Sequence, residues 1–264
     1  VFENIDDDVN YNVALFLAYK LNIKHDIMPL VEKYGQTLLS EFDDFTYENI
    51  KILIEKWGGD IEKKVERRYY IPKNEEIPEL RKKRIERLEN RQIEQENSQE
   101  DLNVNELKKI NVDVLKVGRY IDFIGNILKN YSGKMENELR EDCIDFIFNS
   151  ALKVIGSFCN FSRDIVDKII DMIERKAEEN DDEDMKIKSK FIQVIKARFT
   201  DIFFEFIRCN IMVISLSLEC DILKENIASY CHTHYSEFVR MTQLEYLIRI
   251  SNIKLPVDEI KSLF

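Results

Sequence analysis

Apolar residues recur at intervals of three and four positions along most of the chain, which is the spacing of one face of an α-helix. The first such series is Val9, Val13, Phe16, Leu17 and Leu21. It directly follows Asp6, Asp7 and Asp8, and acidic side chains are favoured at a helix N-terminus because the backbone N–H groups there carry partial positive charge. The pattern predicts a helix that begins near residue 8.

Two more short helices are predicted in the N-terminal region. Pro29 favours the start of one, because the first turn of a helix does not use the N–H that proline lacks. Another is predicted to begin at Thr46 and to end at Gly58 and Gly59. A charged helix is expected over residues 61–70. These elements together predict an N-terminal helical unit over residues 1–72.

Residues 73–103 interrupt this pattern. Pro78 lies among residues that are nearly all polar, and the few apolar residues lack the spacing of a coiled coil. The stretch is typical of a solvated helix or of a partly disordered linker. We interpret it as a charged connector between two units.

Helical periodicity returns in residues 104–264, which we expect to form a larger helical bundle. The expected helices cover residues 104–131, 134–158, 162–179, 186–206, 211–218, 222–230 and 236–250. The turns between them are short, so consecutive helices are expected to pack as antiparallel hairpins.

Gly118 and Gly125 lie seven residues apart inside the first helix of this bundle. A glycine in a helix interior costs about 1 kcal/mol relative to alanine. Two glycines at this spacing share a helix face, so we expect a neighbouring helix to approach the backbone closely at both positions.

The composition agrees with long helices. The chain has 7 glycines and 4 prolines, too few for the turns of a sheet-rich fold, and 44% hydrophobic residues, enough for a substantial core. We predict an all-α protein: an antiparallel helical bundle or an irregular, HEAT-like stack of helical hairpins, with a small N-terminal helical unit.

The most apolar stretch is residues 199–218, and its longest uncharged part is the ten residues 209–218. A membrane-spanning helix needs about 20 apolar residues. We therefore expect no membrane span and interpret the stretch as a buried helix of the core.

Cysteine and histidine side chains gather at one place. Cys209, Cys220 and Cys231 recur every eleven residues, and His232 and His234 follow the last of them. On one helix such thiols would share a face but lie about 16 Å apart, too far for one zinc ion with sulfur bonds of about 2.3 Å. We interpret them as buried, reduced thiols on a core-facing stripe of an intracellular protein, cytoplasmic or nuclear, and expect no metal and no cofactor.

The acidic run EENDDED, residues 178–184, is a candidate magnesium site. However, Asp181, Asp182 and Asp184 lack the spacing of the DDxxD motif of isoprenoid synthases, and no second acidic motif accompanies them. A calcium-binding loop is excluded as well, because that loop needs a central glycine. The run is typical of a solvated loop between helices.

Basic residues cluster within and beside the connector. The candidate partner-binding residues are Arg67, Arg68, Tyr69, Tyr70, Arg81, Lys82, Lys83, Arg84 and Arg87. Cations beside aromatic rings occur on nucleic-acid-binding surfaces, but a net charge of −11 disfavours nucleic acid. The glutamates between these cations are typical of a solvated helix face, and as a binding surface the patch suits an acidic protein better.

Sequence signatures of catalysis are missing. Nucleophilic catalysis by serine or cysteine commonly uses histidine, and the chain has only three histidines from which such a partner could come. The chain also contains no phosphate-binding glycine loop and no HExxH or ExxH motif. We expect a non-catalytic protein–protein interaction scaffold or a subunit of an intracellular multi-protein assembly. The alternatives are an accessory factor in RNA or DNA processing that uses the basic patch, and a metal-dependent enzyme that uses the acidic run.

Overall fold

The computed structural model describes residues 1–40, 42, 45–56, 104–177 and 183–251, and every regular element within these ranges is helical. The α-helices are α1 (Asp8–Lys20), α2 (Met28–Leu39), α3 (Tyr47–Lys56), α6 (Val104–Tyr131), α7 (Asn137–Ala177), α8 (Glu183–Ser217), α9 (Lys224–Thr233) and α10 (Glu237–Ser251). A π-helical segment, Ile23–Ile27, joins α1 to α2. The predicted all-α class is confirmed, and the HEAT-like description stays a prediction.

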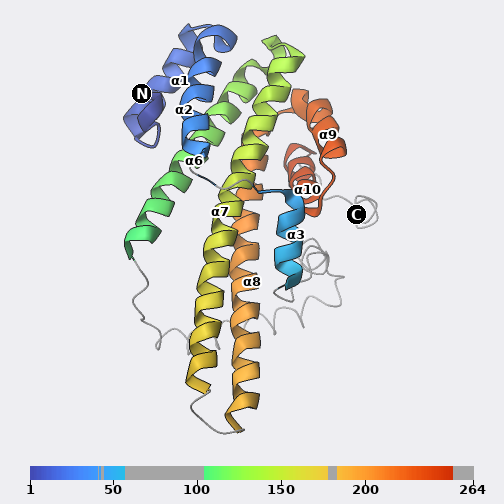
Figure 1. The fold of residues 1–264 in the computed structure, drawn as a ribbon. Helices are drawn as coiled ribbons and strands as arrows, with labels where there is room; N and C mark the ends of the chain where they lie inside the picture. Colours follow the sequence, from blue (N-terminus) through green and yellow to red (C-terminus); the bar gives the residue numbers. More distant parts are fainter. Residues whose placement is uncertain (41, 43–44, 57–103, 178–182, 252–264) are drawn as a thin grey trace, which may run out of the picture.

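Three long helices form the centre of the molecule. Helices α6, α7 and α8 all pack against one another, and α7 and α8 make an antiparallel hairpin (Figure 1). With 41 and 35 residues, α7 and α8 are about 60 and 50 Å long. Their far ends extend beyond the other helices, which gives the molecule an arm (Figure 1).

The shorter helices cover the half of this hairpin that contains the start of α7 and the end of α8 (Figure 1). Helices α1 and α2 pack on α6, α3 and α9 pack on α7, and α10 packs on α8 and α9. One hydrophobic cluster extends from Phe2 to Tyr246, so the N-terminal helices share a core with the later ones. The connector predicted at residues 73–103 lies outside the described residues, so the division into two units stays a prediction.

An aromatic cluster attaches α3 to the C-terminal helices. The Tyr47 hydroxyl lies 3.1 Å from the Tyr230 hydroxyl of α9, and the Tyr47 ring stacks on Phe238 of α10. Tyr230 also stacks on Phe148 of α7, with ring centroids 4.2 Å apart. Stacked aromatic pairs contribute beyond their buried area, so this cluster fixes α3 against three helices at once.

Two predicted helix breaks do not exist. The predicted helices 134–158 and 162–179 are one helix, α7, and the predicted helices 186–206 and 211–218 are one helix, α8. Ser162 is buried inside α7, and Asn210 donates a side-chain hydrogen bond of 2.9 Å to the Phe206 carbonyl one turn earlier. Polar residues whose local preference is to end a helix are thus accommodated inside one by packing and by side-chain hydrogen bonds to the helix backbone.

The prediction for the two glycines of α6 is confirmed at one position and wrong at the other. A Cβ built on Gly125 would lie 2.6 Å from Ser217 Cβ and 2.7 Å from Ser217 Cα. A Cβ built on Gly118 would meet nothing within 4 Å. Of these two glycines, only Gly125 is therefore explained by close helix packing, because the end of α8 lies against α6 at this position.

These two glycines form a matched pair for mutation. Gly125→Ala is expected to lower the free energy of unfolding by about 1–3 kcal/mol, because the new methyl group overlaps the Ser217 backbone. Gly118→Ala is expected to raise it by up to about 1 kcal/mol, through the better helix propensity of alanine. Chemical denaturation followed by circular dichroism measures both, and equal effects at the two sites would contradict the contact.

Candidate functional site

The residues predicted to bind a partner cannot be placed. The whole basic patch, Arg67, Arg68, Tyr69, Tyr70, Arg81, Lys82, Lys83, Arg84 and Arg87, lies outside the described residues. The acidic run lies mostly outside them as well, and its last two residues begin α8. Within the described part of the chain, no group of three or more histidine, cysteine, aspartate or glutamate side chains could hold a metal ion.

The three cysteines of the eleven-residue series do not lie on one helix. Cys209 lies in α8 and is exposed, Cys220 follows α8 and is half-buried, and Cys231 lies buried in α9. The prediction of a buried stripe is therefore wrong for Cys209. The physical reason is that α8 ends at Ser217, where the chain turns and the Cys220 N–H donates to the Leu218 carbonyl.

Buried and exposed thiols differ in their expected reactivity. Burial raises the pKa of Cys143 and of Cys231 to about 12, and it raises the pKa of Cys159 as well. The thiolate is the reactive form, so these three thiols are both enclosed and protonated near neutral pH. They are unsuited to nucleophilic catalysis in this state.

Iodoacetamide labelling tests this difference. At neutral pH we expect Cys209 to react first, Cys220 more slowly, and Cys143, Cys159 and Cys231 only after unfolding. Mass spectrometry of partially alkylated protein locates the label, and the same reaction in guanidinium chloride should label all five cysteines. Early alkylation of Cys143 in the native protein would contradict its burial.

An exposed apolar stripe follows the outer face of α8. Phe191, Val194 and Ile202 are 55, 54 and 55% exposed, and Leu216 continues the same face near the end of the helix. Exposed Cys209 lies between them, and all five positions fall within about a quarter of the helix circumference at 100° per residue. The stripe is about 38 Å long.

The α8 stripe corrects the interpretation of residues 199–218 as a buried helix. Phe203, Ile207 and Ile214 are buried as expected, but Ile202 and Leu216 face solvent. The helix is apolar on two sides, and only one of them contacts the rest of the described molecule. The recurrence of apolar side chains at i, i+3, i+11 and i+25 from Phe191 is the sequence signal that could have revealed the second face.

Helix α1 also has apolar residues on two sides. The series that predicts the helix is not its buried face: Val9 and Phe16 are 69 and 58% exposed, and Val13 is exposed too. The buried face consists of Tyr11, Ala14 and Ala18. Two alanines on this face let the α1 backbone lie close to α6, which leaves the larger side chains outside.

Polar contacts hold α1 in this orientation. The Tyr11 hydroxyl donates to the Asp122 carboxylate of α6 and accepts a 2.8 Å hydrogen bond from the Asn126 amide. Burial and the hydrogen bond to Asp122 raise the pKa of Tyr11, so the hydroxyl stays protonated as a donor. Arg119 of α6 pairs with Asp8 and lies over the Tyr11 ring. These contacts fix which side of α1 faces solvent.

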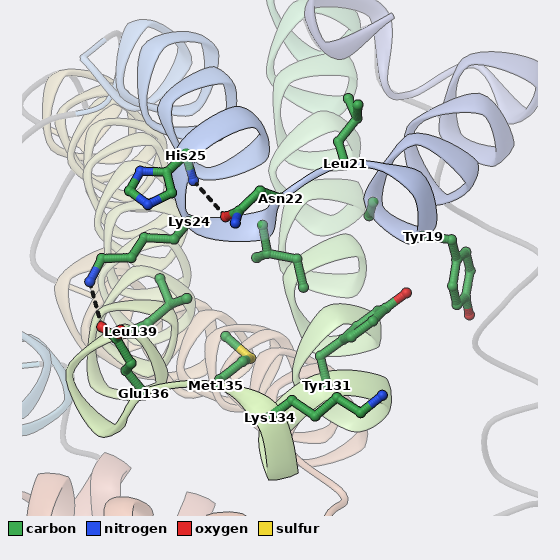
Figure 2. A pocket seen from close by; sticks show the side chains of 12 residues that line it. Tyr19, Leu21, Asn22, Lys24, His25, Tyr131, Lys134, Met135, Glu136 and Leu139 are labelled. Carbon is green, nitrogen blue, oxygen red and sulfur yellow. Dashed lines mark hydrogen bonds and ion pairs between the residues drawn. The ribbon is translucent and has the colours of Figure 1, made fainter.

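A hollow of about 310 Å³ lies at the C-terminal end of α1, where the π-helical segment faces the end of α6 and the start of α7. Figure 2 shows Lys24 reaching Glu136 across one side, while Tyr19 and Tyr131 lie on the other with ring centroids 5.7 Å apart. The ion pair raises the pKa of Lys24 and lowers that of Glu136.

Both pKa shifts favour the charged forms of this ion pair. Both Lys24 and Glu136 are charged near neutral pH, whereas general acid–base catalysis needs a pKa close to the working pH. A second hollow of about 500 Å³ lies between the start of α3 and the start of α10, lined by Tyr47 and Arg240 among others.

No protein-family model, curated protein or solved structure matches the chain. None of the helices in the described residues is long and apolar enough to cross a membrane. The two exposed apolar faces, on α1 and on α8, are the most distinctive features of the described surface.

Proposed function

We propose that the protein is a non-catalytic interaction scaffold or subunit of a multi-protein assembly, and that it binds a partner along α8. The observation that carries this proposal is the exposed apolar stripe of α8, formed by Phe191, Val194, Ile202, Cys209 and Leu216. Large apolar side chains gathered on one exposed face are typical of protein interaction sites, whereas single ones scattered over a surface are normal.

The shape of the stripe indicates the kind of partner. It is long and narrow because it follows one helix, α8, whose N-terminal part lies in the arm that projects from the body (Figure 1). An amphipathic helix that lies alongside α8 would match it, with apolar side chains at helical spacing. Burying one large apolar side chain contributes about 1.5–3 kcal/mol, part of which offsets the loss of freedom on association.

Exposed Arg198 and Glu205 lie within the stripe, between its apolar residues, and favour one alignment of the partner. Arg208 donates a 2.6 Å hydrogen bond to Glu205, which lies on the exposed side of α8 next to Cys209. Charged groups of an interface contribute mainly to specificity and to the association rate. The apolar residues should therefore determine the strength of binding.

A double substitution on the arm tests the proposal. Phe191→Gln with Ile202→Gln removes two apolar contacts but keeps good helix formers, and Ile52→Gln on α3 is a control of the same exposure. In pull-downs from the source lysate, read by mass spectrometry, wild type and control should retain a common set of proteins. The double variant should retain these at least about tenfold less well, a loss of about 1.4 kcal/mol.

Two measurements make the result decisive. Thermal melting should be nearly unchanged in the double variant, because the substituted side chains are exposed. The pull-down should be repeated with nuclease and at two salt concentrations. Equal retention by all three proteins would rule out the α8 stripe, and partners that vanish with nuclease would favour the nucleic-acid alternative instead.

A further inference from the structure

The α8 stripe belongs to a longer series of regularly spaced residues. Starting from Phe191, positions at alternating intervals of four and three residues lie on one side of α8. The series is Phe191, Ile195, Arg198, Ile202, Glu205, Cys209, Met212 and Leu216. Ile195 and Met212 are half-buried, and the other six are exposed. Two successive intervals make seven residues, which is the repeat of a coiled coil, so we call this series the outer seam.

The opposite side of α8 is already filled. Helix α8 packs against α6, α7 and α10, and its buried side includes Phe203, Ile207 and Ile214. Within the described residues, no helix covers the outer seam, as the exposure of Phe191, Ile202 and Leu216 shows. A second helix packed along this seam would bury it in the way that coiled-coil partners bury each other.

Two charged residues lie between the apolar residues of the outer seam. Arg198 and Glu205 are one heptad apart, which is about 10 Å along the helix axis, and both are exposed. Glu205 accepts a hydrogen bond from Arg208, but an exposed ion pair of this kind contributes little free energy and leaves Glu205 able to meet another base. Polar residues in a coiled-coil seam lower stability and specify the partner and its register.

We propose that the outer seam binds a heptad-repeat helix of a different protein, with an acidic residue that meets Arg198 and a basic residue that meets Glu205. This partner chemistry rests on the proposed function and makes it more specific. The acidic and the basic residue of the partner lie seven positions apart, and the other seam residues of the partner are apolar. Because the outer seam is about 38 Å long, a helix of about 25 residues would cover it.

A second copy of α8 does not supply this chemistry. A symmetric pair of α8 helices is either parallel and in register or antiparallel. The parallel pair places Arg198 against Arg198 and Glu205 against Glu205, so like charges meet. The antiparallel pair that places Arg198 against Glu205 also places Ile202 against the exposed carboxylate of Asp201. Both arrangements oppose association, which favours a helix of another sequence.

Three labelled synthetic peptides test the charge requirement. Each has four heptads with leucine and isoleucine in the seam, except at two seam positions one heptad apart. Those two positions hold one glutamate and one lysine, two glutamates, or two lysines. Fluorescence anisotropy with the intact protein in excess should give a dissociation constant on the order of 1–100 μM for the mixed peptide. The other two peptides should bind at least about fivefold more weakly, because each brings like charges together at one position.

Reversal of one seam charge should change which peptide binds best. Glu205→Arg makes both seam charges positive, so the double-glutamate peptide should bind at least about fivefold more tightly than the mixed one. Arg198→Glu makes both negative and should favour the double-lysine peptide. Glu55→Arg on α3, an exposed glutamate with the same charge change as Glu205→Arg, should keep the wild-type order. Unfolding weakens all three peptides and cannot produce these reversals.

The pull-down that tests the proposed function separates two kinds of failure. Proteins lost by the Phe191→Gln, Ile202→Gln variant should also be retained at least about fivefold less well by Arg198→Glu and by Glu205→Arg. If both charge variants retain these proteins fully and the three peptides bind equally, α8 binds a partner without this charge requirement. That result overturns the partner chemistry and leaves the proposed function standing. If the apolar variant loses no protein either, the proposed function fails as well.

Sedimentation equilibrium of the protein alone tests the choice of a different chain. We expect a monomer, because neither symmetric pairing of α8 is favourable. A dimer that the Phe191→Gln, Ile202→Gln variant abolishes would show that a second copy covers the outer seam, and it would overturn the proposal.

Discussion

The close contact between Gly125 and Ser217 is the constraint on which the arrangement of the bundle depends. It brings the backbone of α6 next to the C-terminal end of α8, which closes the third side of the α6, α7 and α8 core. Phe123, Ile124, Ile127 and Leu128 around Gly125 are all buried as a result. Helices α1 and α2 then pack on α6, so the placement of the N-terminal helices follows from the same contact.

Helices α1 and α8 have apolar side chains on opposite sides, and only one side of each is buried against the other described helices. In α1 the buried side is made of small residues and a hydrogen-bonded tyrosine, and the large residues face out. In α8 the buried side contacts α7, α6 and α10, and the other side is open along the arm. Within the described part of the chain, packing therefore leaves two apolar faces exposed, which is the physical basis for expecting assembly.

Much of the fold could be predicted from periodicity, capping residues and the scarcity of glycine and proline. The start of α1 after the aspartates is confirmed by the Asp7 carboxylate, which accepts hydrogen bonds from the N–H groups of Val9 and Asn10. The continuity of α7 and α8 could not be predicted, because tertiary packing outweighs the local preferences of residues such as Ser162. Which of two apolar faces is buried could not be predicted either: a periodic apolar series indicates a helix, and it does not indicate which side its neighbours cover.

The length of the hairpin carries the Phe191 end of the α8 stripe away from α1. Helix α1 lies at one end of the molecule and the first turn of α8 at the other, with about 50 Å of α8 between its ends (Figure 1). A molecule bound at Phe191 and Val194 alone would therefore leave α1 accessible, whereas one that also covers Leu216 would reach the end of α8 that contacts α6.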